Sequence, residues 1–223
     1  MIPWKLLDSS EVAGEAEKLT LSRRGDEYSI KTGYTELMNS RMHGSEDALA
    51  ELGCKGLKSK PQARVLIGGL GMGFTLSETL KHVSNDAEVV IAELVPAVIQ
   101  WNQTHLSALA GHPLKDTRVR VHQGDVGKLI RLEKASFDAI LLDVDNGPEG
   151  LTRKENDALY SPSGLKASLA GLREGGVFGV WSTFPDPRFT KRMQQAGFKV
   201  EEVPVRAHGK RGSKHMLWLG KRR

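Results

Sequence analysis

Between Ala63 and Gly220, short apolar runs typical of buried strands alternate with segments of helical spacing. The strand-like runs are RVLIG (64–68), EVVIAE (88–93), RVRVHQ (118–123), FDAILLD (137–143) and VFGVW (177–181). Because a parallel strand pair needs a long crossover, usually a helix, this alternation predicts a mostly parallel sheet with helices on both faces. The last two runs, FKVEEVPV (198–205) and HMLWLG (215–220), are joined by a segment too short for a crossover helix, so we expect them to be antiparallel. The fold class is therefore α/β with seven strands, the last of them antiparallel.

The first 62 residues have a different pattern. Two short alternating segments flank Arg24-Gly25-Asp26, which predicts a β-hairpin. A helix is expected from about Ser45, whose hydroxyl can cap it. The polar stretch 55–62 contains Gly and Pro and is typical of a linker. We therefore expect a small N-terminal β-hairpin and helix segment (1–62), followed by the main domain (63–223).

Composition and charge narrow the class of protein. Hydrophobic residues make up 39% and charged residues 26% of the 223 residues, as in an ordinary globular chain. The chain has no apolar run of membrane-spanning length and no signal-peptide pattern, so we expect a cytoplasmic protein without membrane contact. The seven histidines and single cysteine show no ligand spacing, and no metal is expected. The formal charge of +5 derives from a basic tail, residues 206–223. This tail is either a solvated surface or, less favoured, a nucleic-acid contact.

A glycine cluster directly follows the first main-domain strand. Gly68, Gly69, Gly71 and Gly73 lie between this strand and the next predicted helix. A tight strand-to-helix turn needs positive φ, and a nucleotide can approach closely only where Cβ is absent. The cluster therefore predicts either a nucleotide-binding loop or a plain tight turn.

Acidic residues follow the other parallel strands. Glu93, followed by Leu94, ends the second strand, where a carboxylate can bind both ribose hydroxyls. Gly124, Asp125 and Val126 follow the third strand, where a side chain can reach an adenine amino group. Asp143 ends the fourth. Ligands bind at the carboxyl edge of a parallel sheet, so we expect these residues to gather there. Glu93 as a solvated acid and Asp125 as a helix N-cap remain alternatives.

These motifs resemble the class I methyltransferases that use S-adenosyl-L-methionine (AdoMet). The loop spacing is GxGxG where dinucleotide-binding proteins usually have GxGxxG, which favours AdoMet over NAD. The resemblance implies a Rossmann-like AdoMet-binding domain. In it, the glycine loop holds the methionine part, Glu93 the ribose and Asp125 the adenine.

Within that class the chain resembles the spermidine synthase (aminopropyltransferase) family. The segments IGGLGMG, AELVPAVI, HQGDV and FDAILLDVDNGPEGL match its motifs in order. The chain departs from the family in three ways. The glycine motif lacks an embedded Asp, the Asp143 stretch is two residues shorter, and Arg41 stands where the family has a Glu that helps hold the polyamine. We expect Arg41 to repel a dicationic polyamine.

The resemblance and these departures together imply AdoMet-dependent methyl transfer to an unidentified small-molecule acceptor. The resemblance gives Asp143 the position of the family's catalytic base, and Asp145 lies beside it. Alternatively, the segment after Asp143 is only a turn built from favoured turn residues. Two alternatives stay open: a polyamine aminopropyltransferase that uses decarboxylated AdoMet, and a non-catalytic nucleoside- or RNA-binding module. The resemblance also implies a homodimer.

Overall fold

The computed structural model describes residues 2–12, 17–144, 158–208 and 211–223, which form two sheets. The first is an antiparallel sheet with its strands in chain order, formed by β1 (Lys5–Ser10), β2 (Leu19–Arg24), β3 (Glu27–Thr32) and β4 (Thr35–Asn39). The strands of the second sheet are β5 (Arg64–Gly68), β6 (Glu88–Glu93), β7 (Val119–Gln123), β8 (Phe137–Leu142), β9 (Leu172–Ser182), β10 (Lys199–His208) and β11 (Arg211–Lys221). The helices are α1 (Gly44–Gly53), α2 (Phe74–His82), α3 (Pro96–Gln103), α4 (Val126–Leu132), α6 (Pro162–Gly171) and α7 (Pro187–Ala196), with short 3₁₀ turns at Leu57–Ser59 and Pro113–Lys115.

The second sheet has the predicted combination of parallel strands and an antiparallel final pair. Its strand order is β10-β11-β9-β8-β5-β6-β7. The pairs β5–β6, β6–β7, β5–β8 and β8–β9 are parallel, whereas β11 runs antiparallel to both β9 and β10. The expected α/β fold and the antiparallel final pair are therefore confirmed.

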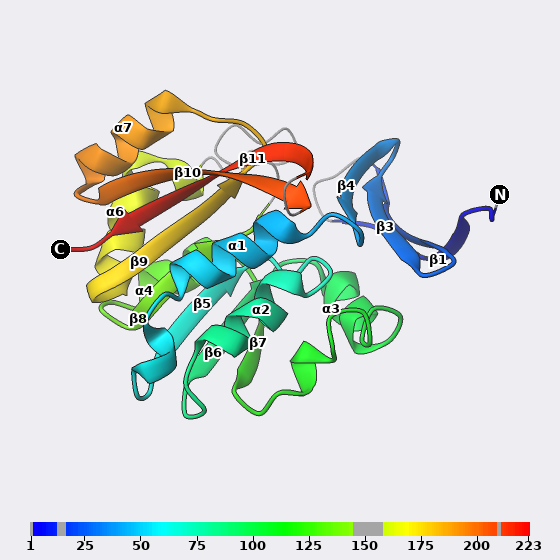
Figure 1. Ribbon diagram of the computed structural model, residues 1–223, viewed down its shortest axis with the longest axis horizontal. Helices are drawn as coiled ribbons and strands as arrows, with labels where there is room; N and C mark the ends of the chain where they lie inside the picture. Colours follow the sequence, from blue (N-terminus) through cyan, green and yellow to red (C-terminus); the bar gives the residue numbers. More distant parts are fainter. Residues whose placement is uncertain (1, 13–16, 145–157, 209–210) are drawn as a thin grey trace.

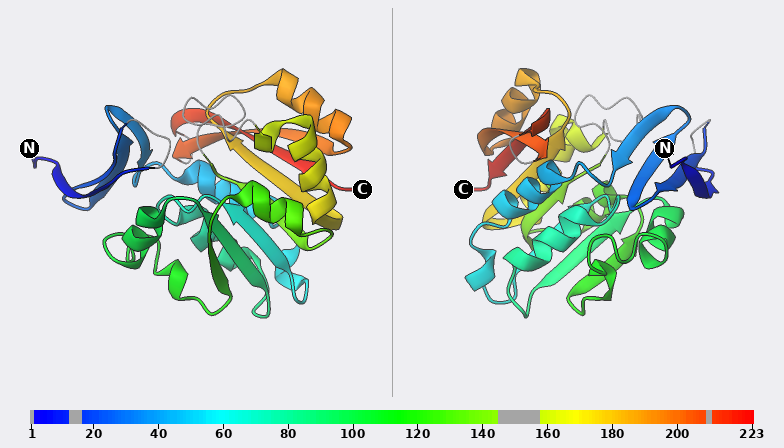
Figure 2. Two further views of the ribbon diagram at one scale, coloured as in Figure 1. Left: turned by 180° about the vertical axis from the view of Figure 1, so that it is seen from behind. Right: turned by 45° about the vertical axis from the view of Figure 1, so that its right-hand side comes forward.

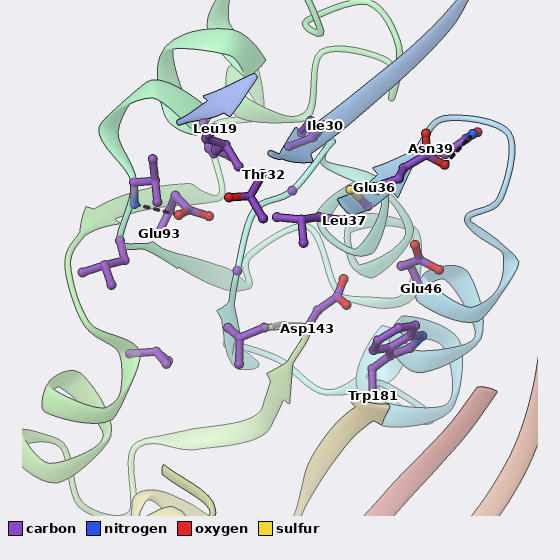
Figure 3. Close-up of a pocket in the computed structure, with 18 of the residues that line it drawn as sticks. Leu19, Ile30, Thr32, Glu36, Leu37, Asn39, Glu46, Glu93, Asp143 and Trp181 are labelled. Carbon is purple, nitrogen blue, oxygen red and sulfur yellow. Dashed lines mark hydrogen bonds between the residues drawn. The ribbon is translucent and has the colours of Figure 1, made fainter. Parts of the chain in front are cut away.

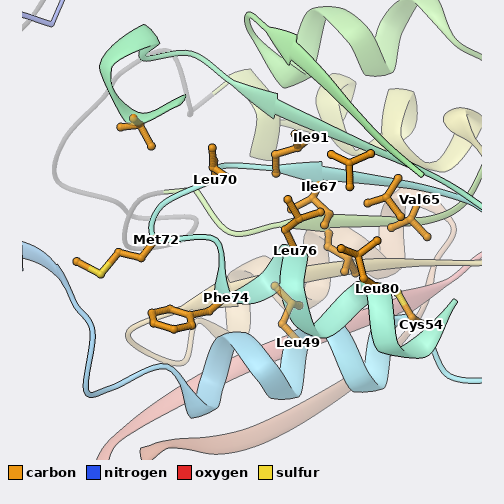
Figure 4. Close-up of a cluster of buried hydrophobic side chains, with 14 of the residues drawn as sticks. Leu49, Cys54, Val65, Ile67, Leu70, Met72, Phe74, Leu76, Leu80 and Ile91 are labelled. Atoms are coloured by element: carbon orange, nitrogen blue, oxygen red, sulfur yellow. The ribbon is translucent and has the colours of Figure 1, made fainter. Parts of the chain in front are cut away.

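Helices cover both faces of this sheet (Figure 1). Side chains of α1, α2 and α3 share one core cluster with one face, and α4, α6 and α7 share a second cluster with the other. Figure 4 shows the first cluster, in which Leu49 of α1 and Leu76 of α2 meet Val65 and Ile67 of β5. Side chains from both faces bury β5 and β8 almost completely, which explains why these strands are continuous apolar runs.

The antiparallel sheet lies beside the carboxyl ends of the parallel strands (Figures 1 and 2). The hairpin predicted around Gly25 is confirmed as β2–β3, but β1 and β4 were not predicted. Leu21 and Ile30 join the core cluster on the α1 face of the large sheet. The indole Nε1 of Trp101 in α3 also donates a 2.7 Å hydrogen bond to Asp8 in β1. These contacts attach the small sheet to the main one.

Helix α1 begins differently from the prediction. Its N-cap is His43, which makes no side-chain capping bond, and the hydroxyl of Ser45 donates to Glu46 Oε2 at 2.5 Å instead. The expected Ser45 cap is therefore wrong, because α1 already begins at Gly44 and Ser45 lies within its first turn. Helix α1 packs against α2, β9 and β10 of the main domain. The division of the chain into domains at residue 62 stays a prediction. Of the helices in the described ranges, none has the length and hydropathy needed to cross a bilayer.

Candidate active site

The glycine loop between β5 and α2 lies directly against the end of β8. Gly69, Gly71 and Gly73 have φ values of +89°, +51° and +85°. A Cβ on Gly69 would lie 2.3 Å from the carbonyl oxygen of Asp143. Positive φ and this close approach both require glycine at position 69, as the sequence predicted for a tight turn at this point.

A cavity of about 350 Å³ lies between this loop, the carboxyl edge of the parallel sheet and the small antiparallel sheet. Figure 3 shows Glu93 at one end of it, with the carboxylates of Glu46 and Asp143 and the ring of Trp181 toward the other. Leu19, Ile30, Thr32 and Leu37 line its wall, and all four come from the N-terminal residues that form the small sheet.

Most residues predicted for donor binding line this cavity. They are Gly69, Gly71, Glu93, Leu94, Gly124, Asp125, Val126 and Asp143. Gly68 and Gly73 are not among the lining residues; a Cβ on Gly68 would instead meet the side chains of Leu142 and Val126. Asp145 lies outside the described residues, so its role stays a prediction.

The carboxylate of Glu93 is buried and fixed by backbone N–H groups. Its Oε2 accepts from the Leu70 N–H at 2.9 Å, and its Oε1 accepts from the Val95 N–H at 2.8 Å. Each carboxylate oxygen has a second lone pair. Because Glu93 also lines the cavity, hydroxyl groups of a ligand there can donate to the same carboxylate.

Asp125 is the N-cap of α4. Its Oδ1 accepts from the Gly127 N–H at 2.7 Å. The helix-capping alternative is therefore confirmed. Since Asp125 also lines the cavity, capping does not exclude a contact with a ligand.

The carboxyl groups of the half-buried Asp143 and the buried Glu46 interact through their charges. Thr75 Oγ1 donates a 2.6 Å hydrogen bond to Asp143 Oδ2. Burial raises the pKa of Asp143 to about 6, and the Thr75 hydrogen bond opposes that shift. Glu46 is 6% exposed, and burial followed by the charge of Asp143 raises its pKa to about 8. Both carboxyls are thus shifted toward proton uptake near neutral pH.

The sequence-based reasoning missed Glu36 and Glu46. Glu36 in β4 lines the cavity and accepts hydrogen bonds from Ser29 Oγ at 2.6 Å and Asn39 Nδ2 at 3.2 Å. Its strand was not predicted. Glu46 lies in the first turn of α1, where acidic residues are ordinary because of the helix dipole. Its sequence position therefore gave no signal of a site.

Arg41 does not contribute to the cavity. Its guanidinium is exposed and lies 3.1 Å from Oε1 of Glu27, and Arg41 is absent from the cavity lining. The expectation that Arg41 would repel a cationic ligand is therefore wrong, because the side chain forms an ion pair elsewhere.

The cavity is strongly acidic. Its described lining includes the carboxyl side chains of Glu36, Glu46, Glu93, Asp125 and Asp143 and contains no Lys or Arg. The nearby His215 has a pKa lowered by burial, which disfavours its charged form. An arrangement of this kind favours cationic ligands.

Comparison with known proteins identifies the family that the chain is similar to. The family model described as "Spermine/spermidine synthase domain" matches residues 43–196. A polyamine aminopropyltransferase of Clostridium tetani is 30% identical over 132 residues, which cover 58% of this chain and 45% of that protein. One of Leptospira biflexa is 33% identical over 145 residues, which cover 62% and 50%. The chain thus spans about half the length of the curated relatives it matches.

Solved structures match over nearly the whole chain. The spermidine synthase of Thermotoga maritima superposes with a TM-score of 0.76 at 18% identity, covering 98% of this chain and 73% of that one. A probable spermidine synthase of Corynebacterium glutamicum gives 0.66 at 15% identity, covering 96% and 79%. At these identities the likeness shows the fold alone.

The comparisons correct the main functional expectation. Methyl transfer is contradicted, because the matching family model and the curated relatives are those of aminopropyltransferases. The departures in the glycine motif and at Arg41 therefore do not place the chain outside the family. With α1 through α7 inside the matched segment, the chain belongs to the spermine/spermidine synthase domain family.

Proposed function

We propose that the protein transfers an aminopropyl group from decarboxylated AdoMet to an amine acceptor. The observation that carries this proposal is the cavity lined by five carboxyl side chains and, within its described lining, by no Lys or Arg. Decarboxylated AdoMet has a sulfonium and an ammonium group and no carboxylate. An amine acceptor is also cationic in water. The cavity thus has charge opposite to both substrates.

The donor fits the end of the cavity formed by the parallel strands. The backbone at Gly69 and Gly71 allows close approach of the donor, while the carboxylate of Glu93 lines the cavity where ribose hydroxyls can donate to it. Asp125 lies where an adenine amino group can be bound. The sulfonium of the donor supplies the activated carbon, so the protein mainly has to align donor and acceptor.

The acidic lining distinguishes the two possible donors. The carboxylate of intact AdoMet would enter a cavity whose described lining is acidic and offers no Lys or Arg to pair with. At an effective dielectric constant of about 20 and a separation of about 8 Å, one carboxylate pair repels by roughly 2 kcal/mol. This energy corresponds to roughly 30-fold in affinity, in favour of the decarboxylated donor.

The acceptor fits the end of the cavity near Asp143 and Glu36. Curated relatives are named polyamine aminopropyltransferases, and a polyamine has several amines along one flexible chain. Asp143 next to the glycine loop can bind the reacting amine, and Glu36 in the small sheet can bind a second ammonium.

The proposal is tested by product analysis with matched donors. The protein is incubated with AdoMet or decarboxylated AdoMet and with putrescine, cadaverine, spermidine or no amine. We expect methylthioadenosine and an aminopropylated amine only where the decarboxylated donor and an amine are both present. Calorimetry should give at least tenfold tighter binding of the decarboxylated donor. Tighter binding of AdoMet, or methylated amine as the product, would refute the proposal.

A further inference from the structure

A second carboxyl group faces the position at which the reacting amine is proposed to bind. Glu46 is 6% exposed, lines the cavity and interacts electrostatically with Asp143. Figure 3 shows the two carboxylates with Trp181 at the same end of the cavity, away from Glu93. The segment with Glu46 is part of α1, whereas Asp143 follows β8, so two distant parts of the chain form this pair.

No protein cation neutralises this pair in the part of the chain that the structure describes. The hydroxyl of Ser45 donates to Glu46 Oε2 at 2.5 Å, but no Lys or Arg among the described residues forms an ion pair with Glu46 or Asp143. The other titratable groups around it are Asp47, bound to His43 at 2.8 Å, and Glu36 and His215 across the cavity. An isolated buried carboxylate is costly unless something compensates it. An ammonium group of a ligand would supply that compensation.

We propose that Glu46 and Asp143 together bind the reacting amine of the acceptor, and that Glu46 accepts its proton. This inference rests on the proposed function and assigns a second acidic residue to its acceptor end. The higher pKa of Glu46, about 8 against about 6 for Asp143, makes it the better proton acceptor of the two. Thr75 binds Asp143 Oδ2 and favours its ionised form, which can then hold the amine electrostatically.

The chemical step balances with these groups. The bound ammonium gives a proton to the Glu46 carboxylate and becomes a neutral amine. Its nitrogen lone pair forms a bond to the methylene carbon of the donor as the bond from that carbon to sulfur breaks. The electron pair of the broken bond stays on sulfur, which yields neutral methylthioadenosine and a secondary ammonium product. Glu46 then releases its proton to water.

The test uses three variants of the whole protein. Glu46→Gln keeps the shape and removes the base, Glu46→Asp keeps the charge on a shorter side chain, and Glu51→Gln changes an exposed acid on the same helix. For Glu46→Gln we expect kcat/KM for the amine to fall by roughly 100-fold or more. The Kd of decarboxylated AdoMet should stay within about threefold, because the donor binds at the other end of the cavity. Glu46→Asp should be intermediate and Glu51→Gln unchanged.

The pH profile separates a catalytic from a merely structural role. In the wild type, activity should fall toward acid as Glu46 becomes protonated. In Glu46→Gln the acid limb should move to lower pH, because it then follows Asp143, whose pKa of about 6 lies below the value of about 8 for Glu46. An active wild type whose Glu46→Gln variant keeps full activity and the same profile would overturn this inference alone. A wild type that forms no product with any amine would overturn the proposed function and this inference with it.

Discussion

The buried carboxyl of Glu46 makes a prediction about stability that needs no substrate. Burial and the charge of Asp143 raise its pKa from an ordinary 4.5 to about 8. Between these two values the folded protein keeps a proton that the unfolded chain has released. Stability should therefore be greatest below about pH 4.5 with respect to this group, and should fall as pH rises toward 8. At about 1.4 kcal/mol for each pH unit, the loss amounts to at most roughly 5 kcal/mol.

The variant Glu46→Gln does not titrate and should escape this loss. We expect it to equal the wild type in free energy of unfolding near pH 4.5 and to exceed it by several kcal/mol at pH 9, which is large beside a typical total of roughly 5–15 kcal/mol. Urea unfolding at pH 5, 7 and 9, followed by fluorescence of the buried Trp101 and Trp218, measures the difference. The raised pKa of Asp143 also lowers the free energy of unfolding as pH rises. Because it does so in both proteins, this contribution largely cancels from the difference between them. A difference that does not grow with pH, or one matched by Glu51→Gln, would refute the reasoning.

Three further substitutions test other parts of the site. Gly69→Ala should lower the free energy of unfolding by about 2 kcal/mol or more, because its Cβ would meet the Asp143 carbonyl at 2.3 Å and its φ is +89°; urea unfolding checks this. Glu93→Gln should weaken methylthioadenosine binding by about tenfold or more in calorimetry, because an amide has one accepting oxygen where the carboxylate has two. Thr75→Val should raise the pKa of Asp143 further, leave less of it ionised to hold the amine and so raise the KM for the amine near pH 7, whereas Thr79→Val, one turn along α2, should leave that KM unchanged in steady-state kinetics.

The donor end of the site could be predicted because each of its residues follows a strand that the hydrophobic pattern identifies. RVLIG, EVVIAE and FDAILLD are recognisable as buried strands, and the carboxyl ends of parallel strands meet at one edge of the sheet. Glu93 and Asp143 therefore had to lie near the glycine loop once the sheet was assigned. The positive φ of Gly69 followed from the tight turn between a strand and a helix.

The acceptor end could not be predicted in the same way, because tertiary docking brings it together. Glu36 lies on β4, a short and largely exposed strand with little apolar pattern, and Glu46 lies at the start of a helix. Neither position reveals which way the side chain faces. The error over Arg41 has the same origin. Its place in the sequence predicted a positive charge beside the acceptor, whereas in the structure Arg41 pairs with Glu27 and does not line the cavity.

The residues that line the cavity differ in whether the segment matched by the family model contains them. The matched segment, residues 43–196, contains the glycine loop, Glu93, Asp143 and Glu46. Glu36 and His215, which line the cavity from the small sheet and from β11, lie outside it. The proposed donor binding and proton uptake therefore lie in the segment that the family model matches, while the proposed contacts beyond the reacting amine lie on flanking strands outside that segment. Acceptor length should accordingly be selected by the small sheet and β11, and the amine panel measures that selection.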